Sequence, residues 1–312
     1  MSGGITVVVP THRRPAQLAR CLEALALQDL PPALLSVVVA EDGGPTADVT
    51  ALRQRDFGAL DITWLAQPHR GPAAARNLGA AAATSDFLAF TDDDCRPRPS
   101  WARTLLQALE ARPGLVLGGH TVNTLTTNAY SCASQLLVAY ITESGTGGHA
   151  PFFASNNVAL SRTLFEELHG FDATFPLAGG EDRDFCDRCI QRGHSMLHLP
   201  EAVVDHDHAL SLGSFLRQHY RYGRGAHRFH RARALREGRR SFGAALGSLR
   251  AADLRFYVDL IRYPFRPQAS AAGAPRERRH LSSLLLLLSQ VPNTLGFFAE
   301  QLRSVGPSPD DA

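Results

Sequence analysis

The residues best suited to chemistry in this sequence follow an apolar strand that ends in three consecutive aspartates. Residues 84–95 read TSDFLAFTDDDC, so Asp92, Asp93 and Asp94 come directly after the hydrophobic run 87–90. Alternate strand residues share a face, so Asp92 and Asp94 can bind one cation between them. Oxygen ligands suit Mg²⁺ or Mn²⁺, and these cations in turn suit a diphosphate. The same triplet also fits a polar turn with an aspartate N-cap for the helix that begins near Pro99.

The residues around this triplet predict alternating strands and helices, an α/β fold class. The expected strands are residues 5–9, 35–39, 62–65 and 87–90, and the expected helices begin at Pro15, Ala73 and Pro99. Repeated strand and helix units with fully apolar strands indicate a mainly parallel sheet flanked by helices. Ligands bind beyond the carboxyl ends of the strands in such sheets. The polar clusters 11–13, 41–43 and 92–94 all fall at those ends, which predicts one shared crevice.

The first strand is not followed by a glycine-rich phosphate loop. Residues 10–14 read PTHRR, which matches neither G-x-G-x-x-G nor G-x-x-x-x-G-K-[ST]. This argues against a dinucleotide dehydrogenase and against a P-loop NTPase. A metal ion on the aspartates is the expected substitute for such a loop.

Composition indicates a globular protein that works in a reducing compartment. The chain has 312 residues, of which 44% are hydrophobic, and its formal net charge is +2. All 32 basic residues are arginine, and they are concentrated in the C-terminal half. The five cysteines are odd in number and lack disulfide-like spacing, and no signal peptide opens the sequence, so we expect a cytoplasmic protein. Cys186 and Cys189 lack a second pair that would complete a zinc site, so we expect them to pack within a helix.

Five motifs in order resemble a family 2 glycosyltransferase. The motifs are VVVPTHRR (7–14), EDGG (41–44), RGPAAARNLG (70–79), FTDDD (90–94) and GGEDRDF (179–185), and they extend over roughly the first two-thirds of the chain. The resemblance implies a GT-A fold, which is Rossmann-like, and an inverting enzyme whose D-x-D motif binds a metal. It also implies a nucleotide-diphosphate sugar as donor, a UDP-sugar in the first instance, and Mn²⁺ or Mg²⁺ as cofactor.

The resemblance also implies roles for individual residues. Thr11 and Asp42 would contact the nucleobase, with Arg76 bracing that pocket, and Asp92 would face the ribose. Asp182 would be the catalytic base. The remaining residues expected at the donor are Arg13, Asp93, Asn157 and Glu181, and those expected at the metal are Asp92, Asp94 and His206. Without the resemblance, Glu181 and Asp182 would be ordinary helix N-caps, Asn157 a buried polar strand residue, and Arg76 a plain helix residue.

The elements after Pro113 are less regular. The expected elements are a strand at 114–122, a helix at 128–141, a strand at 152–160, a helix starting at Glu181 and a strand at 196–204. The stretch 145–148 is expected to be a flexible loop or linker. The last strand leads into Asp205-His206-Asp207-His208, where His206 is the candidate metal ligand and a solvated surface turn is the alternative.

The C-terminal region, 211–312, is expected to be helical and basic. Residues 217–240 contain nine arginines and three histidines against one acid, Glu237. Such a stretch is typical of a membrane-surface element, while nucleic-acid binding is the weaker expectation. Residues 281–299 carry no formal charge, but their serines, Gln290, Pro292 and Asn293 suit a surface helix near anionic lipid better than a spanning one. Packing onto the catalytic domain is the alternative.

These observations predict two domains and one principal function. Residues 1–210 would form the catalytic domain, with 1–112 binding the nucleotide and 113–210 carrying the acceptor site and the base. The sequence lacks the Q-x-x-R-W motif of processive synthases, so a nonprocessive transfer to an acceptor hydroxyl is expected, in the cytoplasm or at the inner face of the membrane. The alternatives are a sugar-phosphate nucleotidyltransferase and a noncatalytic module that binds nucleotide-sugar or RNA.

Overall fold

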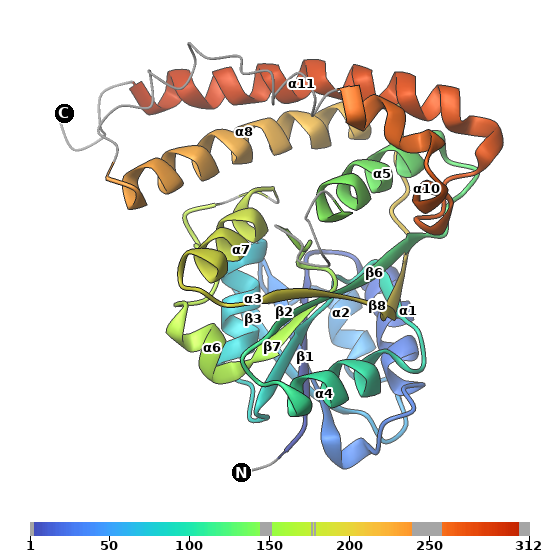
Figure 1. Cartoon of the computed structure of the whole chain (residues 1–312). Helices are drawn as coiled ribbons and strands as arrows, with labels where there is room; N and C mark the ends of the chain where they lie inside the picture. Colours follow the sequence, from blue (N-terminus) through green and yellow to red (C-terminus); the bar gives the residue numbers. More distant parts are fainter. Residues whose placement is uncertain (1–2, 144–151, 176, 178, 239–257, 306–312) are drawn as a thin grey trace.

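A mixed eight-stranded sheet forms the centre of the molecule, with helices on both faces and a helical layer above one end (Figure 1). The computed structural model describes residues 3–143, 152–175, 177, 179–238 and 258–305. The expected loop at 145–148 lies outside these residues. The strand order is β3-β2-β1-β4-β7-β6-β8-β5. This arrangement confirms the predicted α/β, GT-A-like fold class.

The N-terminal half of the sheet is parallel, as its apolar strands predict. It consists of β1 (Ile5–Thr11), β2 (Leu35–Asp42), β3 (Asp61–Gln67) and β4 (Phe87–Phe90). In register, Val7 of β1 lies beside Val37 of β2 on one side and Ala89 of β4 on the other. The carboxyl ends of β1, β2 and β4 therefore meet at one edge of the sheet, where the three polar clusters follow them.

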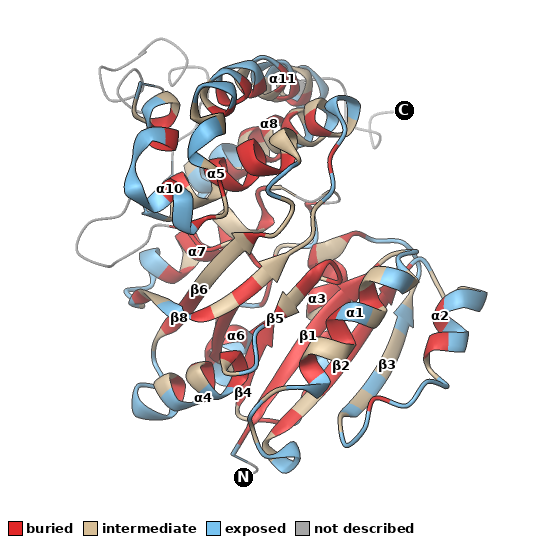
Figure 2. Ribbon diagram, turned by 90° about the vertical axis from the view of Figure 1, so that its right-hand side faces the viewer, coloured by how far each residue is buried: buried red, intermediate tan, exposed pale blue. Residues whose placement is uncertain are grey.

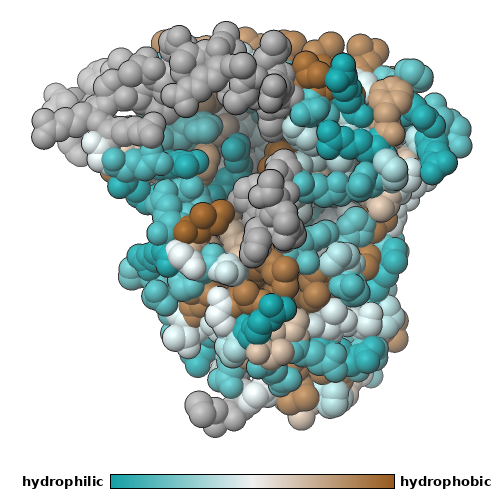
Figure 3. All heavy atoms as spheres, viewed as in Figure 1, coloured by the Kyte–Doolittle hydropathy of each residue, from teal (hydrophilic) through white to brown (hydrophobic). Residues whose placement is uncertain are grey.

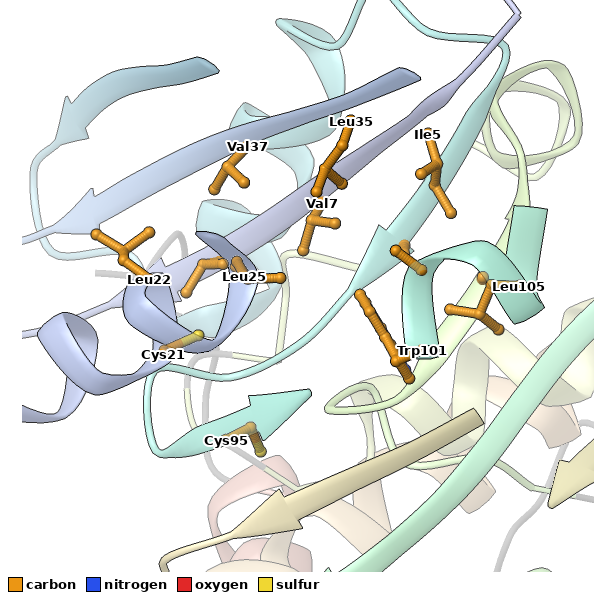
Figure 4. Close-up of a cluster of buried hydrophobic side chains, with 14 of the residues drawn as sticks. Ile5, Val7, Cys21, Leu22, Leu25, Leu35, Val37, Cys95, Trp101 and Leu105 are labelled. Atoms are coloured by element: carbon orange, nitrogen blue, oxygen red, sulfur yellow. The ribbon is translucent and has the colours of Figure 1, made fainter. Parts of the chain in front are cut away.

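Helices bury both faces of this half (Figure 2). The connecting helices are α1 (Pro15–Ala26), α2 (Ala47–Leu52), α3 (Pro72–Ala81) and α4 (Trp101–Ala111), and a 3₁₀ turn (Pro32–Leu34) precedes β2. Leu22 and Leu25 of α1 meet Val7 and Val37 of the sheet in a cluster that also includes Trp101 (Figure 4). Full burial of each such side chain stabilises the fold by about 1.5–3 kcal/mol. This core fixes the strand ends at which the acidic residues lie.

The C-terminal half of the sheet is mixed. It contains β5 (Cys95–Pro97), β6 (Val116–Asn123), β7 (Val158–Ser161) and β8 (Met196–His206). β7 runs antiparallel to β4 and β6, and β5 runs antiparallel to β8. The strand expected at 152–160 begins only at Val158, because the chain turns at Asn157, whose N–H donates to the carbonyl of Ala154. β8 extends two residues beyond Val204, so His206 is the last residue of a strand.

The remaining helices lie above the carboxyl ends of the strands and along the sheet. They are α5 (Ala129–Glu143), α6 (Arg162–Glu167), α7 (Glu181–Gln191), α8 (Leu212–Arg236), α10 (Pro267–Ala271) and α11 (Arg279–Val305), with 3₁₀ turns at Tyr263–Phe265 and Arg276–Arg278. All five cysteines are free and buried, and Cys186 and Cys189 pack inside α7 as expected.

The two long C-terminal helices, α8 and α11, pack along each other (Figure 1). Glycines permit the close approach: a Cβ at Gly223 of α8 would lie 1.8 Å from the carbonyl oxygen of Asn293, and a Cβ at Gly296 of α11 would lie 2.0 Å from that of Tyr220. Glu300 of α11 accepts hydrogen bonds from Arg224 and Arg228, each at 2.6 Å. Leu285 and Leu286 of α11 also pack against α5, so the 281–299 helix contacts the part of the chain assigned to the catalytic domain, as the alternative expected.

Candidate active site

Asp94 lies at the centre of a cluster that two histidines complete. Nε2 of His206 is 3.3 Å from Asp94 Oδ1, and Nδ1 of His208 is 3.4 Å from Asp94 Oδ2. The two imidazole rings stack with their centroids 5.2 Å apart. Burial alone would raise the pKa of Asp94, but the histidines lower it well below its usual value. A carboxylate with two imidazoles is a donor set that suits Mn²⁺. Sequence reasoning included His206 and left out His208.

The side chain of Asp93 points into the protein and interacts with the end of β1. Thr11 Oγ1 donates a hydrogen bond to Asp93 Oδ2 at 2.7 Å, which connects Thr11 to the acidic triplet. Arg14 Nη1 lies 3.2 Å from Asp93 and 3.1 Å from Asp94. Arg13, the residue expected at the donor, is exposed, and its positive φ of 54° turns the chain so that Arg14 faces the carboxylates. Burial and the neighbouring Asp94 raise the pKa of Asp93 to about 7, against the effects of Arg14 and Thr11.

Arg76 links the aspartate triplet to the start of α7. Its Nη2 donates to Asp92 Oδ1 at 2.7 Å, and its Nη1 donates to Glu181 Oε1 at 3.3 Å. Arg76 and Glu181 are buried, and the second Glu181 oxygen accepts the N–H of Gly179 at 2.7 Å. Burial and the adjacent Asp182 raise the pKa of Glu181 to about 7, although Arg76 opposes the rise. Glu181 is thus fully engaged in holding its own loop.

Asp182 is engaged differently from its neighbour. Its Oδ1 accepts the N–H of Arg183 at 2.9 Å, and the N–H of Ser155 also donates to this carboxylate. The side chain is half-buried, and among the described residues no side chain donates a hydrogen bond to it. Burial raises the pKa of Asp182, while Arg76 and the two backbone donors oppose the rise. A carboxylate with a raised pKa and a free edge can accept a proton.

Asp42, at the end of β2, organises the 67–71 turn. Its Oδ1 accepts from Gln67 Nε2 at 2.9 Å and from the N–H of Arg70 at 2.7 Å, and its Oδ2 accepts from the N–H of Gly71 at 2.9 Å. His69 Nδ1 lies 2.7 Å from the same carboxylate. Burial would raise the pKa of Asp42, but the hydrogen bonds from Arg70, Gln67 and Gly71 lower it overall.

Two histidine rings lie next to Asp42. His12 and His69 have ring centroids 4.5 Å apart, and His12 Nδ1 contacts the carbonyl oxygen of Asp42. His69 is largely exposed, so it can move away and leave Asp42 Oδ2 with the N–H of Gly71 as its donor and room for one more. A carboxylate beside a pair of flat rings offers a hydrogen-bond acceptor and an aromatic surface in one place, and a planar base can use both. Sequence reasoning found Asp42 but neither histidine.

Asn157 makes structural contacts and is separate from the acidic cluster. Its Oδ1 accepts from Trp101 Nε1 at 2.9 Å, and its Nδ2 donates to the carbonyls of His120 and Ala202 at 3.2 and 3.0 Å. These three bonds favour the interpretation of Asn157 as a buried polar residue. It lines a shallow open recess together with Gln135, which contacts His206 Nδ1 at 3.4 Å. The recess therefore lies next to the metal-type cluster.

Helix α8 supplies site residues that local sequence patterns did not reveal. Gln218 Oε1 lies 3.2 Å from His208 Nε2, and Gln218 Nε2 donates to the hydroxyl of Tyr222 at 2.5 Å. A Cβ at Gly225 would lie only 1.7 Å from the carbonyl oxygen of Gly179, which is two residues before Glu181. The C-terminal region thus braces both the histidine cluster and the loop that carries Glu181 and Asp182. The glycines of this arginine-rich helix were the one available signal.

Known proteins of similar sequence support the same family. The family model described as glycosyl transferase family 2 matches residues 6–169, and that described as glycosyl transferase family group 2 matches residues 90–298. The chain is 33% identical over 231 residues to the pre-mycofactocin glycosyltransferase of Mycobacterium tuberculosis H37Rv, covering 70% of this chain and 46% of that protein. It is 25% identical over 228 residues to the glycosyltransferase AglE of Haloferax volcanii, covering 71% and 72%. The chain thus spans about half the length of the mycobacterial relative.

Solved structures share the fold. The mannosyltransferase PcManGT of Pyrobaculum calidifontis, in complex with GDP-Man and Mn²⁺, superposes with a TM-score of 0.59 at 20% identity, covering 94% of this chain and 87% of that one. TarS of S. aureus, residues 1–349 in complex with UDP, superposes with a TM-score of 0.53 at 14% identity, covering 98% and 93%. The motifs, the sheet order and the family match agree, and this chain belongs to glycosyltransferase family 2.

Proposed function

We propose that this protein is a metal-dependent, inverting, nonprocessive glycosyltransferase. It would move a sugar from a nucleotide-diphosphate donor to an acceptor hydroxyl. A chain of ion pairs at the carboxyl ends of the strands carries this proposal. Asp94 contacts His206 and His208, and Arg76 joins Asp92 to Glu181, the neighbour of Asp182. One edge of the sheet would thereby hold a cation site, a candidate base, and an arginine that pairs with the carboxylates between them.

The donor side of the crevice would hold the nucleotide. Asp42 and the His12–His69 pair would receive the base, and Asp92 would face the ribose. PcManGT was solved with GDP-Man and Mn²⁺ and TarS with UDP, which supports a nucleotide-sugar as the donor class. A UDP-sugar remains our first expectation.

The residues present fit a divalent metal. Asp94, His206 and His208 offer one carboxylate and two imidazoles, and Asp92 lies in the same triplet. Mn²⁺ or Mg²⁺ bound there would offset negative charge on a diphosphate leaving group. Arg14 contacts both Asp93 and Asp94, so it lies where it would add positive charge beside the same group.

Asp182 is proposed as the catalytic base. Glu181 is engaged by Arg76 and by the N–H of Gly179, so it is the structural member of the pair. Asp182 would take the proton from the attacking acceptor hydroxyl, and an inverting displacement needs one such carboxylate. Burial raises the pKa of Asp182, which makes it a better proton acceptor once ionised.

Single-sugar transfer and a cytoplasmic or membrane-surface location are part of the proposal. At the end of α7, Gln191-Arg192-Gly193 is followed by His194, so no tryptophan of the processive motif follows the base. The recess beside Gln135 and Asn156 is the proposed acceptor side, because it adjoins His206.

The two alternatives find less support. A nucleotidyltransferase needs a phosphate-binding loop after the first strand, and PTHRR does not supply one. An RNA-binding face needs free cations, but Arg224 and Arg228 pair with Glu300, and Arg236 pairs with Asp184 and Asp187. The protein's own acids therefore neutralise part of the basic helix.

Donor hydrolysis measured with and without Mn²⁺ tests the proposal. A panel of sugar nucleotides is first screened by thermal shift in the presence of metal, because a ligand that binds only the native state raises Tm. We expect one donor class to raise Tm only with metal, and the same donor to be hydrolysed slowly without acceptor. A Tm rise without any turnover would favour a binding module, and no response to any sugar nucleotide would contradict the proposal.

A further inference from the structure

An apolar stripe runs along the outer face of α11. Its members are Leu281, Leu284, Leu288, Val291, Leu295, Phe298 and Leu302, which recur at alternating spacings of three and four residues, and Leu287 lies beside them. All eight side chains are between 38% and 76% exposed. Residues at this spacing share one side of a helix. Figure 2 shows the exposed side of α11 pointing away from α8, and Figure 3 shows apolar side chains along the upper edge of the molecule.

The stripe is uninterrupted by charge. Residues 281–299 contain no charged side chain, and the one polar residue at an exposed position between Leu281 and Phe298 is Thr294. Isolated exposed apolar residues are normal on a protein surface, but eight in a row along a helix mark an interaction site. The length and continuity of the stripe therefore call for a partner.

The surroundings of the stripe are strongly positive. Over the described residues 212–238 and 258–305 there are thirteen arginines and four carboxylates, a formal net charge of +9. Arg276, Arg278 and Arg279 precede the stripe, and Arg303 follows its last turn. A leucine-rich face bordered by arginine is the pattern of a helix that lies in a membrane interface, where anionic lipids attract the cations.

The opposite face of α11 is committed to the protein. Gly296 and Gly223 bring α11 and α8 into backbone contact, and Glu300 is held by Arg224 and Arg228. Within the described residues, Arg276–Ser304 is a helix long and apolar enough to cross a membrane by length and composition, and 28% of its apolar window is buried. Its ion-paired inner face fits a helix that lies flat, with one side on the protein and the other in lipid.

We propose that the α11 stripe docks this protein onto a membrane surface that contains anionic lipids. The stripe inserts among the acyl chains next to the headgroups, and the flanking arginines contact lipid phosphates. A second copy of the chain is the competing occupant, but two surfaces of the same high positive charge repel each other. The positions beside the stripe, such as Ser283, Gln290 and Thr294, also lack the opposite charges that set the pairing of helices.

The arrangement places the active site close to the lipid. Helix α8 contacts α11 through Gly223 on one side and the Gly179 loop through Gly225 on the other. One helix layer, about 10 Å, therefore separates α11 from the loop that carries Glu181 and Asp182. This proposal is independent of the donor and of the catalytic base, because it rests on the surface of the C-terminal helices.

Vesicle flotation tests the proposal with the full chain. The vesicles are phosphatidylcholine alone or phosphatidylcholine with one quarter phosphatidylglycerol. The variant Leu284→Glu/Val291→Glu places two charges at the centre of the stripe, where both side chains are exposed. The matched control is Leu27→Glu, because Leu27 is 72% exposed and follows α1, far from α11 in the sequence.

We expect the wild type and Leu27→Glu to float with the anionic vesicles at low salt, and to bind neutral vesicles more weakly. The stripe variant should lose binding by about tenfold or more, with an unchanged circular dichroism spectrum. Added salt should weaken wild-type binding, because it screens the arginines. Absence of flotation at low salt, or equal flotation of the stripe variant, would overturn the proposal. So would a stripe-dependent dimer, detected by light scattering, that does not bind vesicles.

Discussion

Replacement of Arg76 should lower the stability of the protein by an amount that its contacts allow us to estimate. Arg76 is buried, and it joins Asp92 to Glu181 at 2.7 and 3.3 Å. Replacement by methionine keeps much of the volume and leaves the Glu181 carboxylate without its cation. Breaking one side of a buried ion pair typically costs about 3–5 kcal/mol, because the remaining charge stays buried without a partner. Asp92 is 31% exposed, so we assign most of this cost to Glu181.

The pH dependence of this cost has a definite sign. Burial already raises the pKa of Glu181 from 4.5 to about 7 with Arg76 present. A carboxyl group with a raised pKa binds more protons in the folded state, so its contribution to stability falls as pH rises. In the wild type the stability contribution of Glu181 stops falling near pH 7. In Arg76→Met we expect a higher pKa for Glu181, so this contribution keeps falling above pH 7. The stability difference should therefore grow by up to about 1.4 kcal/mol for each pH unit above 7.

Urea titrations of four proteins isolate the effect. These are the wild type, Arg76→Met, Glu181→Gln and the double variant, measured at about pH 6 and about pH 8.5. We expect Arg76→Met to lose about 2 kcal/mol more of its free energy of unfolding at the higher pH than at the lower. The double variant should lose no more than Arg76→Met at either pH. Equal losses for Arg76→Met at both pH values would refute the buried-pair reasoning.

Three further predictions follow from single contacts. Asp94→Ala should abolish the metal-dependent part of donor affinity, and unchanged affinity with and without EDTA in both proteins would count against the metal site. Gly225→Ala should lower the free energy of unfolding by about 1–3 kcal/mol and reduce kcat, because the new Cβ would lie 1.7 Å from the Gly179 oxygen. Gly213→Ala in the same helix is the control, because its Cβ would meet no atom closer than 4.0 Å. Burial lowers the pKa of His219 from 6.5 to about 4. The free energy of unfolding should therefore fall by up to about 3 kcal/mol as pH drops from 6.5 to 4. If the free energy of unfolding of the wild type and of His219→Phe depended on pH in the same way, this prediction would be contradicted.

The parts of the fold that could be predicted from sequence are those with strong local patterns. β1, β2 and β4 are apolar runs that end in polar clusters, and their parallel register follows from the strand and helix alternation. β5 was not anticipated, because its three residues, Cys95-Arg96-Pro97, carry no periodic pattern. The late start of β7 was also missed, because the turn closed by the N–H of Asn157 and the carbonyl of Ala154 leaves no periodic pattern in the sequence.

Sequence motifs located the aspartate triplet and the Glu181–Asp182 pair as candidates. The side chains that contact them come from other segments of the chain, such as Arg76, which joins Asp92 to Glu181. The contacts of Arg14 with Asp93 and Asp94 were not anticipated, because sequence does not reveal the positive φ of Arg13 that precedes it. His208 and Gln218 join the site through contacts between residues more than one hundred positions apart or on another helix, and such contacts depend on the tertiary fold.

The distinction between Glu181 and Asp182 is the centre of the proposed mechanism. Asp182→Asn keeps the size of the side chain and its acceptor for the N–H of Arg183, but it removes the base. Glu181→Gln is the matched control, because it weakens the contact with Arg76 and leaves Asp182 intact.

The most direct test is therefore kcat for Asp182→Asn, measured with a donor and acceptor turned over by the wild type, together with donor Kd and Tm. A positioned base typically contributes about 10²–10⁴-fold. We predict a fall in kcat of that size with donor Kd and Tm close to the wild-type values. A variant that loses Tm and keeps its turnover per folded molecule would show that Asp182 only caps α7 and that the base lies elsewhere.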